Sequence, residues 1–195
     1  MNNFIKLYLL SALSLSFVHA DTVKFGLGSC LDQDFPQPIW DAIGEENLDY
    51  FVFLGDNVYG DVPSGSLRKM VGAYKKQKDL FPKWLDSVEI FPIWDDHDYG
   101  LNDAGSEYPL KRQSQEIFLN FWDISLDDDR HNRDGIYFSE EKIINGKVFK
   151  LIFLDTRFFR SKLKGPKGNY VENLNPDATI LGTSQWNWLE SELKD

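Results

Sequence analysis

Short apolar runs that end in polar residues recur along the chain and predict strands. Residues 23–28, 49–54 and 89–94 are three such runs, and residues 39–46 between the first two have helical periodicity. A strand–helix–strand unit places its strands parallel. Within the second run, residues 51–54 are all apolar, so we expect that strand to be buried on both faces. The pattern predicts an α/β fold.

Further along the chain, helical periodicity returns in four places, and Ser66 and Thr183 are suitable N-cap residues for two of these helices. The predicted helices cover residues 66–78, 81–88, 111–122 and 183–193.

A hairpin is predicted in the second half of the chain. Residues 136–144 and 147–155 are both rich in strand-forming residues, and Asn145-Gly146 lies between them. Asn-Gly between two such runs is the strongest short-range hairpin signal.

The composition fits one folded domain and excludes several classes of protein. The chain has 195 residues, of which 15% are aromatic, which argues against disorder. The net charge is −10 and no basic patch occurs, so we expect no nucleic-acid partner. An acidic chain is compatible with bound metal cations.

The first 20 residues resemble an export signal. Lys6 precedes an apolar, serine-rich stretch at 7–18, and Val18-His19-Ala20 is a suitable cleavage site. The stretch has about 12 apolar positions, too few to span a bilayer as a membrane anchor. We therefore expect residues 1–20 to be cleaved and residues 21–195 to form an exported domain, periplasmic or extracellular, without a stable membrane span.

Polar residues follow each predicted strand, and we expect them to meet at one rim, because ligands bind at the carboxyl ends of strands in such sheets. A carboxylate after a strand can also simply cap the next helix. The four groups are Cys30; Asp56, Asn57 and Tyr59; Asp95, Asp96, His97 and Asp98; and Asp155 and Arg157.

These donor types favour a metal site, because crowded carboxylates repel one another unless a cation neutralises them. Thiolate, phenolate and carboxylate together suit trivalent iron, whereas carboxylates and amides alone suit calcium, magnesium or manganese. Zinc is possible, but one cysteine and few histidines make a poor structural zinc set. Two metals would support hydrolysis by activating a water.

Several of these residues have alternative interpretations. Cys30 is either a metal ligand, a buried structural thiol or the cysteine of a lipoprotein-like box at 27–30. His97 either contacts a phosphoryl group and protonates the leaving oxygen, or is a surface imidazole. Arg157 either clamps a phosphate or pairs with Asp155 or a neighbour.

Four motifs, in the same order and with compatible gaps, make residues 23–195 resemble the alkaline phosphatase D (PhoD-like) metallophosphatase family. They are GSC at 28–30, GDNVYGD at 55–61, WDDHDYG at 94–100 and LDTRFFR at 154–160. The resemblance implies a metallophosphoesterase-like αββα sandwich and hydrolysis of a phosphate-ester substrate.

The resemblance also implies a set of ligands. Ferric iron would be held by Cys30, Asp56 and Tyr59, with Asp56 bridging to calcium or another divalent cation. Asp96 falls at the place of a further metal ligand, and His97 at that of a phosphate-contacting histidine. Arg157 falls on the family's Asp-Thr-Arg element, and we add it and Asn57 as expected substrate contacts, with His97, Asp56 and Arg157 as the catalytic residues.

The sequence departs from the family pattern at two places. Asp98 stands where the family usually has glutamate, and the later Gly-Asp-x-His element of the superfamily would lie beyond residue 195. We therefore expect a domain that is incomplete at its C-terminus, more readily a fragment of a longer enzyme than a true truncation. The alternative function is a non-catalytic remnant that binds only metal or phosphate.

Overall fold

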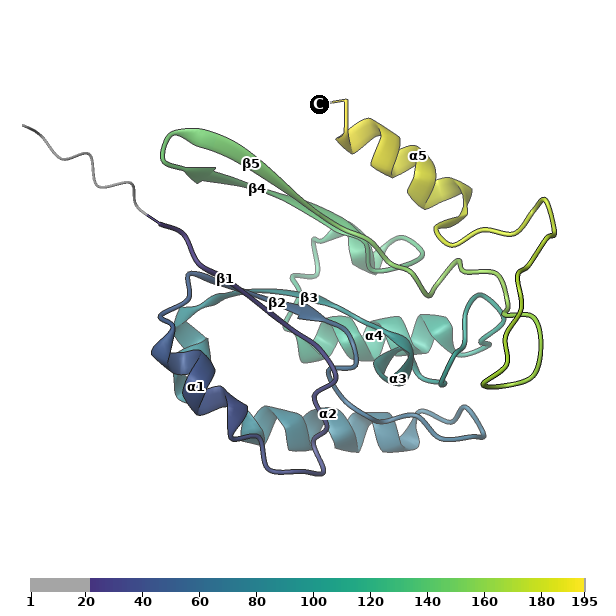
Figure 1. The fold of residues 1–195 in the computed structure, drawn as a ribbon, viewed down its shortest axis with the longest axis horizontal. Helices are drawn as coiled ribbons and strands as arrows, with labels where there is room; N and C mark the ends of the chain where they lie inside the picture. Colours follow the sequence, from purple (N-terminus) through teal and green to yellow (C-terminus); the bar gives the residue numbers. More distant parts are fainter. Residues whose placement is uncertain (1–21, 195) are drawn as a thin grey trace, which may run out of the picture.

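The computed structural model describes residues 22–194, so the predicted export signal at 1–20 lies outside the described residues. Its first half forms a sheet of three parallel strands in the order β1-β2-β3, as Figure 1 shows. The strands are β1 (Phe25–Gly28), β2 (Tyr50–Leu54) and β3 (Glu89–Ile93). The three predicted parallel strands are thus confirmed.

Helices cover one face of this sheet (Figure 1). On β2, Phe51 and Phe53 point to this face and pack with Trp40 and Leu85, whereas Val52 points to the other face. The helical segments of this half are α1 (Ile39–Glu45), α2 (Arg68–Leu80), the 3₁₀ helix η1 (Lys83–Ser87), the short α3 (Asp96–Tyr99) and α4 (Lys111–Phe121).

A two-stranded antiparallel hairpin lies over the other face of the sheet (Figure 1). Its strands are β4 (Phe138–Ile144) and β5 (Lys147–Phe153), preceded by the short 3₁₀ helix η2 (Asp129–His131). Phe138 packs with Val52 and Phe91 of the parallel sheet. The last helix, α5 (Gly182–Glu192), lies beyond the hairpin, where Trp188 contacts the ring of Tyr137 at 4.7 Å.

Some predictions about individual elements are corrected. The helical piece expected at 81–88 is the 3₁₀ helix η1, whereas Leu54 is 47% exposed although its strand is expected to be buried on both faces. Ser66 and Thr183 are not the N-caps, because α2 and α5 begin after Leu67 and Leu181. These differences arise at element ends, which a local sequence pattern defines only to within one or two residues.

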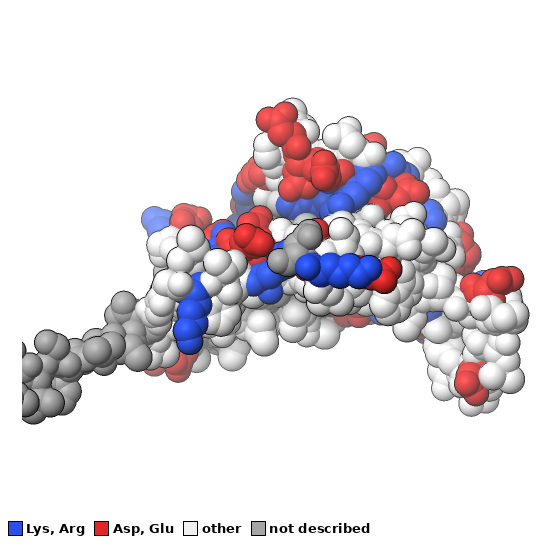
Figure 2. All heavy atoms as spheres, turned by 90° about the horizontal axis from the view of Figure 1, so that it is seen from above, with Lys and Arg blue, Asp and Glu red and all other residues white. Residues whose placement is uncertain are grey.

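Charged side chains of both signs are interspersed on the face over the hairpin and α5 (Figure 2). Lys150, for example, lies 3.5 Å from Glu192 and 3.7 Å from Glu141. This face therefore carries no continuous basic patch. Between residues 22 and 194, the structure contains no helix with the length and apolarity that a bilayer crossing requires.

Candidate metal centre

The ends of β1 and β2 bring the first two predicted ligands together. The Cys30 sulfur lies 3.7 Å from Oδ2 of Asp56, and the backbone N–H of Cys30 donates to the carbonyl of Gly55 at 3.2 Å. Cys30 is exposed, so it is not the buried thiol that was one alternative. Both residues have left-handed backbone conformations, with φ of 59° and 51°. Non-glycine residues adopt this region rarely, and such outliers cluster at functional sites.

Gly55 lets the Asp56 loop pass close to the end of β3. Its φ is 104°, and a Cβ added there would come within 2.4 Å of the backbone nitrogen of Asp95. The glycine is therefore required by both conformation and space. It lets the strand-end residues of β2 and β3 lie against each other.

Asp56, Asp96 and His97 form the centre of the site. One potential ligand atom from each lies within 4.8 Å of the others. The backbone N–H of His97 also donates to Oδ1 of Asp56 at 3.2 Å. Three residues predicted from two different strand ends thus lie at one rim.

Tyr59 and Asn57, the other predicted residues of the β2 loop, lie in different surroundings. The ring of Tyr59 is 4.4 Å from that of His97. Burial is the largest cause that raises the pKa of the Tyr59 phenol, and the hydrogen bond with the Cys30 thiol raises it further. Asn57 is fully buried, and its amide donates to the carbonyl of Ile93 at 2.8 Å. The expected contact of Asn57 with substrate stays a prediction.

Asp61 is a site residue to which sequence reasoning assigned no role. One of its carboxylate oxygens lies 2.7 Å from Nδ1 of His97, and the other accepts the backbone N–H of Asn102. Burial alone would lower the pKa of His97, but the hydrogen bond and charge of Asp61, with the charges of Asp56 and Asp96, outweigh it and raise the pKa. His97 is therefore no isolated surface imidazole. Asp61 and His97 are 36 residues apart in the chain, so no local sequence pattern signals this pairing.

The carboxylate of Asp96 is held by the turn that follows α3. The backbone N–H of Asp103 donates to Oδ2 at 2.6 Å, and the amide of Asn102 donates to the same oxygen at 3.2 Å. Burial alone would raise the pKa of Asp96, but the Asp103 N–H and the charge of Arg157 outweigh it and lower the pKa. Asp96 is thus held as a carboxylate, which is the form that binds a cation.

Arg157 reaches the same rim from the end of β5. Its guanidinium pairs with Asp95, and Nη2 lies 3.9 Å from Oδ1 of Asp96. The expected strand-end rim therefore includes a residue that follows the hairpin, which forms a separate two-stranded sheet. Nη1 has no hydrogen-bond partner among the described residues.

Asp155 and Asp98, two other strand-end carboxylates, hold the backbone together and take no direct part in the cluster. Asp155 is fully buried and accepts from Nε1 of Trp94 at 2.9 Å, which ties the hairpin to the end of β3. Asp98 accepts four N–H groups: the backbone of Asp95, Asp56 and Asn57, and the Asn57 amide. The alternative that a carboxylate after a strand caps the next helix is thus correct for Asp98, which forms a capping box with Asp95.

The donor set fits a metal ion by its chemistry and by its charges. The carboxylates of Asp56 and Asp96 and the imidazole of His97 form the cluster. The Cys30 thiol lies beside Asp56 and the Tyr59 ring beside His97, and donors of these types can hold a metal cation. Burial and the negative charges of Asp96 and Asp95 raise the pKa of Asp56, although the His97 N–H opposes this. A cation would relieve this crowding of negative charge.

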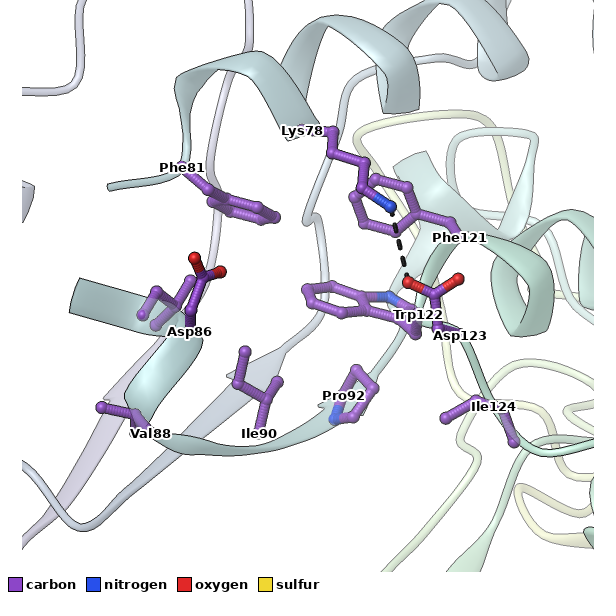
Figure 3. Close-up of a pocket in the computed structure, with 11 residues that line it drawn as sticks. Lys78, Phe81, Asp86, Val88, Ile90, Pro92, Phe121, Trp122, Asp123 and Ile124 are labelled. Carbon is purple, nitrogen blue, oxygen red and sulfur yellow. Dashed lines mark hydrogen bonds and ion pairs between the residues drawn. The ribbon is translucent and has the colours of Figure 1, made fainter. Parts of the chain in front are cut away.

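The cavity in Figure 3 is lined by other residues than those of this cluster. It has a volume of about 280 Å³ and lies between α2, η1, β3 and the end of α4, with Trp122 and Phe81 among its walls. The ion pair of Lys78 and Asp123 stands at its rim. None of the predicted metal or substrate residues lines it, so we exclude it as the candidate site.

Comparison with known protein families gives a match over most of the chain. The model of a protein family described as PhoD-like phosphatase matches residues 25–195. No curated protein and no solved structure matches the chain. The matched range contains all the residues of the cluster described above.

Proposed function

Because the chain belongs to the PhoD-like phosphatase family, we propose that it is a metal-dependent phosphohydrolase that cleaves phosphate esters. The observation that carries this proposal is the convergence of Asp56, Asp96 and His97 within 4.8 Å, beside the Cys30 sulfur. A hydrolase needs such a group of cation ligands next to a proton donor.

Two cations are proposed, each with its own ligands. Cys30, Asp56 and Tyr59 would hold ferric iron, and Asp56 and Asp96 would hold calcium or another divalent ion. Sulfur and phenol oxygen favour the trivalent iron, whereas carboxylate oxygens alone favour the divalent ion. When bound, the cations supply an activated water for in-line attack and neutralise charge on the phosphoryl oxygens.

His97 is proposed to act on the leaving oxygen. Its Nδ1 is taken by Asp61, and its Nε2 has no hydrogen-bond partner among the described residues. The raised pKa favours the protonated ring, so Nε2–H can contact a phosphoryl oxygen or protonate the leaving group. Asp61 would hold the ring in the orientation that this requires.

Arg157 is proposed to position the phosphate. Asp95 holds Nε and Nη2, which orients the planar guanidinium and leaves Nη1 for a ligand. Two anchored donors reduce the conformational entropy that phosphate binding would otherwise cost. Asn57 stays an expected substrate contact, and its buried side-chain amide oxygen has no hydrogen-bond partner in the described part of the chain.

Two broader proposals accompany the reaction. The order of layers, from helices through the parallel sheet and the hairpin to α5, supports an αββα sandwich of the metallophosphoesterase type. The sequence pattern of residues 1–20 supports cleavage of a signal and export of the protein.

Hydrolysis of 4-nitrophenyl phosphate by the purified chain, loaded with ferric iron and calcium, tests the proposal. We expect turnover that strong chelation abolishes and that Asp96→Asn lowers at least about 100-fold, because it removes a negatively charged ligand. The exposed carboxylate of Asp41 on α1 offers a matched control, and Asp41→Asn should leave turnover unchanged.

Two results would contradict the proposal in different ways. Full turnover in the chelated protein would exclude the metal mechanism. A chain that binds both metals but hydrolyses no phosphate ester would exclude the hydrolase and support the binding-only alternative.

A further inference from the structure

A cavity lined by basic residues lies in the long loop between β5 and α5. It has a volume of about 310 Å³. The charged residues in its lining are Arg160, Lys162 and Lys164, and neither aspartate nor glutamate lines it. Such a concentration of positive charge stands out in a chain whose net charge is −10.

In the described part of the chain, no ion pair within 4.0 Å joins a cation of this basic cavity to a carboxylate. Among the described residues, neither Lys162 nor Lys164 has an ion-pair partner within 4.0 Å. The guanidinium of Arg160 donates through Nη2 to the carbonyl oxygen of Asp103, whereas its buried Nε–H has no acceptor. Burial and the charge of Arg157 lower the pKa of Arg160 more than the charges of Glu107, Asp103 and Asp96 raise it, so a further anion nearby would be stabilising.

Arg160 connects the basic cavity to the metal centre. Its backbone N–H donates to the carbonyl of Arg157 at 3.2 Å, and its side chain holds the carbonyl of Asp103. The backbone N–H of Asp103 in turn donates to Asp96. Figure 1 shows this loop passing beside the turn after α3. The cavity is thus two contacts away from a candidate metal ligand.

A neighbouring hollow is lined by carboxylates as well as lysines, so it is a poorer site for an anion than the basic cavity. It has a volume of about 210 Å³ and shares Lys162 and Leu163 with the basic cavity, but Asp103 and Glu107 also line it. Carboxylates there would repel an anion. Of these two neighbouring hollows, the basic cavity is the one whose lining contains no carboxylate.

We propose that the basic cavity binds a second phosphate group of the substrate while the first lies at the metal centre. This inference rests on the proposed function and narrows its substrate class to phosphate esters that carry a further phosphate group. The guanidinium of Arg160 suits phosphate oxygens through its planar donors, and Lys162 and Lys164 add mobile point charges.

The test measures the binding of non-hydrolysable ligands to the metal-loaded chain. Alkane α,ω-diphosphonates of increasing length are compared with methylphosphonate by calorimetric titration. We expect at least one diphosphonate to bind about tenfold more tightly than methylphosphonate. The double variant Lys162→Gln/Lys164→Gln should remove at least about fivefold of this gain and leave methylphosphonate binding unchanged. Both lysines are exposed, so folding should be unaffected.

A matched control and a second arm make the result unambiguous. Lys69→Gln/Lys75→Gln removes the same charge from exposed positions on α2 and should retain the diphosphonate gain. In the second arm, inorganic phosphate is titrated into the chelated chain, where the metals cannot contribute. We expect the Lys162/Lys164 variant to bind phosphate at least about fivefold more weakly than the unmodified chain.

Three results would overturn the proposal. They are the absence of any diphosphonate gain, a gain that survives in the Lys162/Lys164 variant, and phosphate binding that weakens without any effect on diphosphonates. The last result would assign the cavity to free phosphate. Both arms measure binding and do not depend on turnover. Failure of the hydrolysis assay would therefore contradict the proposed function, whereas the binding results would still decide whether the basic cavity holds a phosphate group.

Discussion

His97 and Asp61 show, at the scale of the residue, how one contact decides what a side chain can do. The 2.7 Å contact uses Nδ1, and only Nε2 then remains for a substrate. The Asp61 carboxylate is itself held by the backbone N–H of Asn102. The orientation of the imidazole is therefore set by the turn after α3 as well as by its own helix.

Asp61→Asn should lower kcat about 10- to 100-fold, as expected for loss of a residue that orients a catalytic group. The Asp61 charge raises the pKa of His97, so its removal lowers that pKa and His97 loses its proton at a lower pH. The alkaline limb of the pH profile of kcat should therefore move to lower pH. An unchanged profile would show that Asp61 does not act through His97.

Tyr59→Phe should bleach the visible colour of the iron-loaded protein, because a ferric–phenolate pair absorbs visible light through charge transfer. The Tyr59 phenol lies beside Cys30 and His97, and its raised pKa means that only a bound cation would ionise it at neutral pH. Absorption spectra of the two proteins make the comparison. Tyr170→Phe is the control, since this exposed phenol binds Asp103 in the loop. Equal colour in the Tyr59 variant would exclude the phenolate ligand.

At the scale of the element, the short helix α3 is fixed by one buried carboxylate. Asp98 is fully buried and accepts N–H groups from its own N-cap residue and from the β2 loop. It therefore locks the ends of β2 and β3 together. Its neighbours Asp96 and His97 then point to the metal centre.

Asp98→Asn should lower the free energy of unfolding by roughly 2–4 kcal/mol, because an amide N–H would face donors that need an acceptor. Urea denaturation of the chelated chain measures this without a contribution from metal. Asp127→Asn, at an exposed position, should change stability by less than about 0.5 kcal/mol. An Asp98→Asn variant as stable as the unmodified chain would show that Asp98 does not hold the ends of β2 and β3 together.

The hairpin turn offers a paired test of glycine. Gly146 has a φ of 74°, and its added Cβ would meet nothing within 4 Å, so Gly146→Ala should cost about 1 kcal/mol through backbone strain alone. Gly72 lies inside α2 with equally open space and an ordinary φ, so Gly72→Ala should stabilise the protein by about 0.5–1 kcal/mol. Thermal unfolding distinguishes the two signs. The same sign for both would contradict the conformational argument.

Elements with a strong local pattern were predictable from the sequence. The Asn145-Gly146 hairpin is confirmed because both residues adopt the positive φ that this turn requires. The start of α2 was placed one to two residues early, since Ser66 accepts the backbone N–H of Arg68 without being the N-cap. Local patterns do not determine such ends, which depend on tertiary contacts.

At the scale of the whole molecule, the sheet topology explains which part of the site could be predicted. Parallel strands bring their carboxyl ends to one edge, so Cys30, Asp56 and Asp96 could be grouped from strand order alone. The partners of these residues could not, because Asp61 and Asn102 come from loops whose path depends on the folded core. The position of Arg157 likewise depends on how the hairpin packs on the sheet.

The two carboxylates of the metal centre, Asp56 and Asp96, have few basic side chains around them. The net charge of the chain is −10, and within the described residues Arg157 forms an ion pair with Asp96. A cation bound there should therefore stabilise the whole fold, since it binds the folded chain and not the unfolded one.

Metal content after equilibrium dialysis tests the central claim most directly. The account predicts that the chain retains stoichiometric iron and calcium, that Asp56→Asn loses both, and that Cys30→Ser loses iron alone. Asp41→Asn should retain both metals. Equal metal content in the Asp56→Asn variant and the unmodified chain would contradict the account.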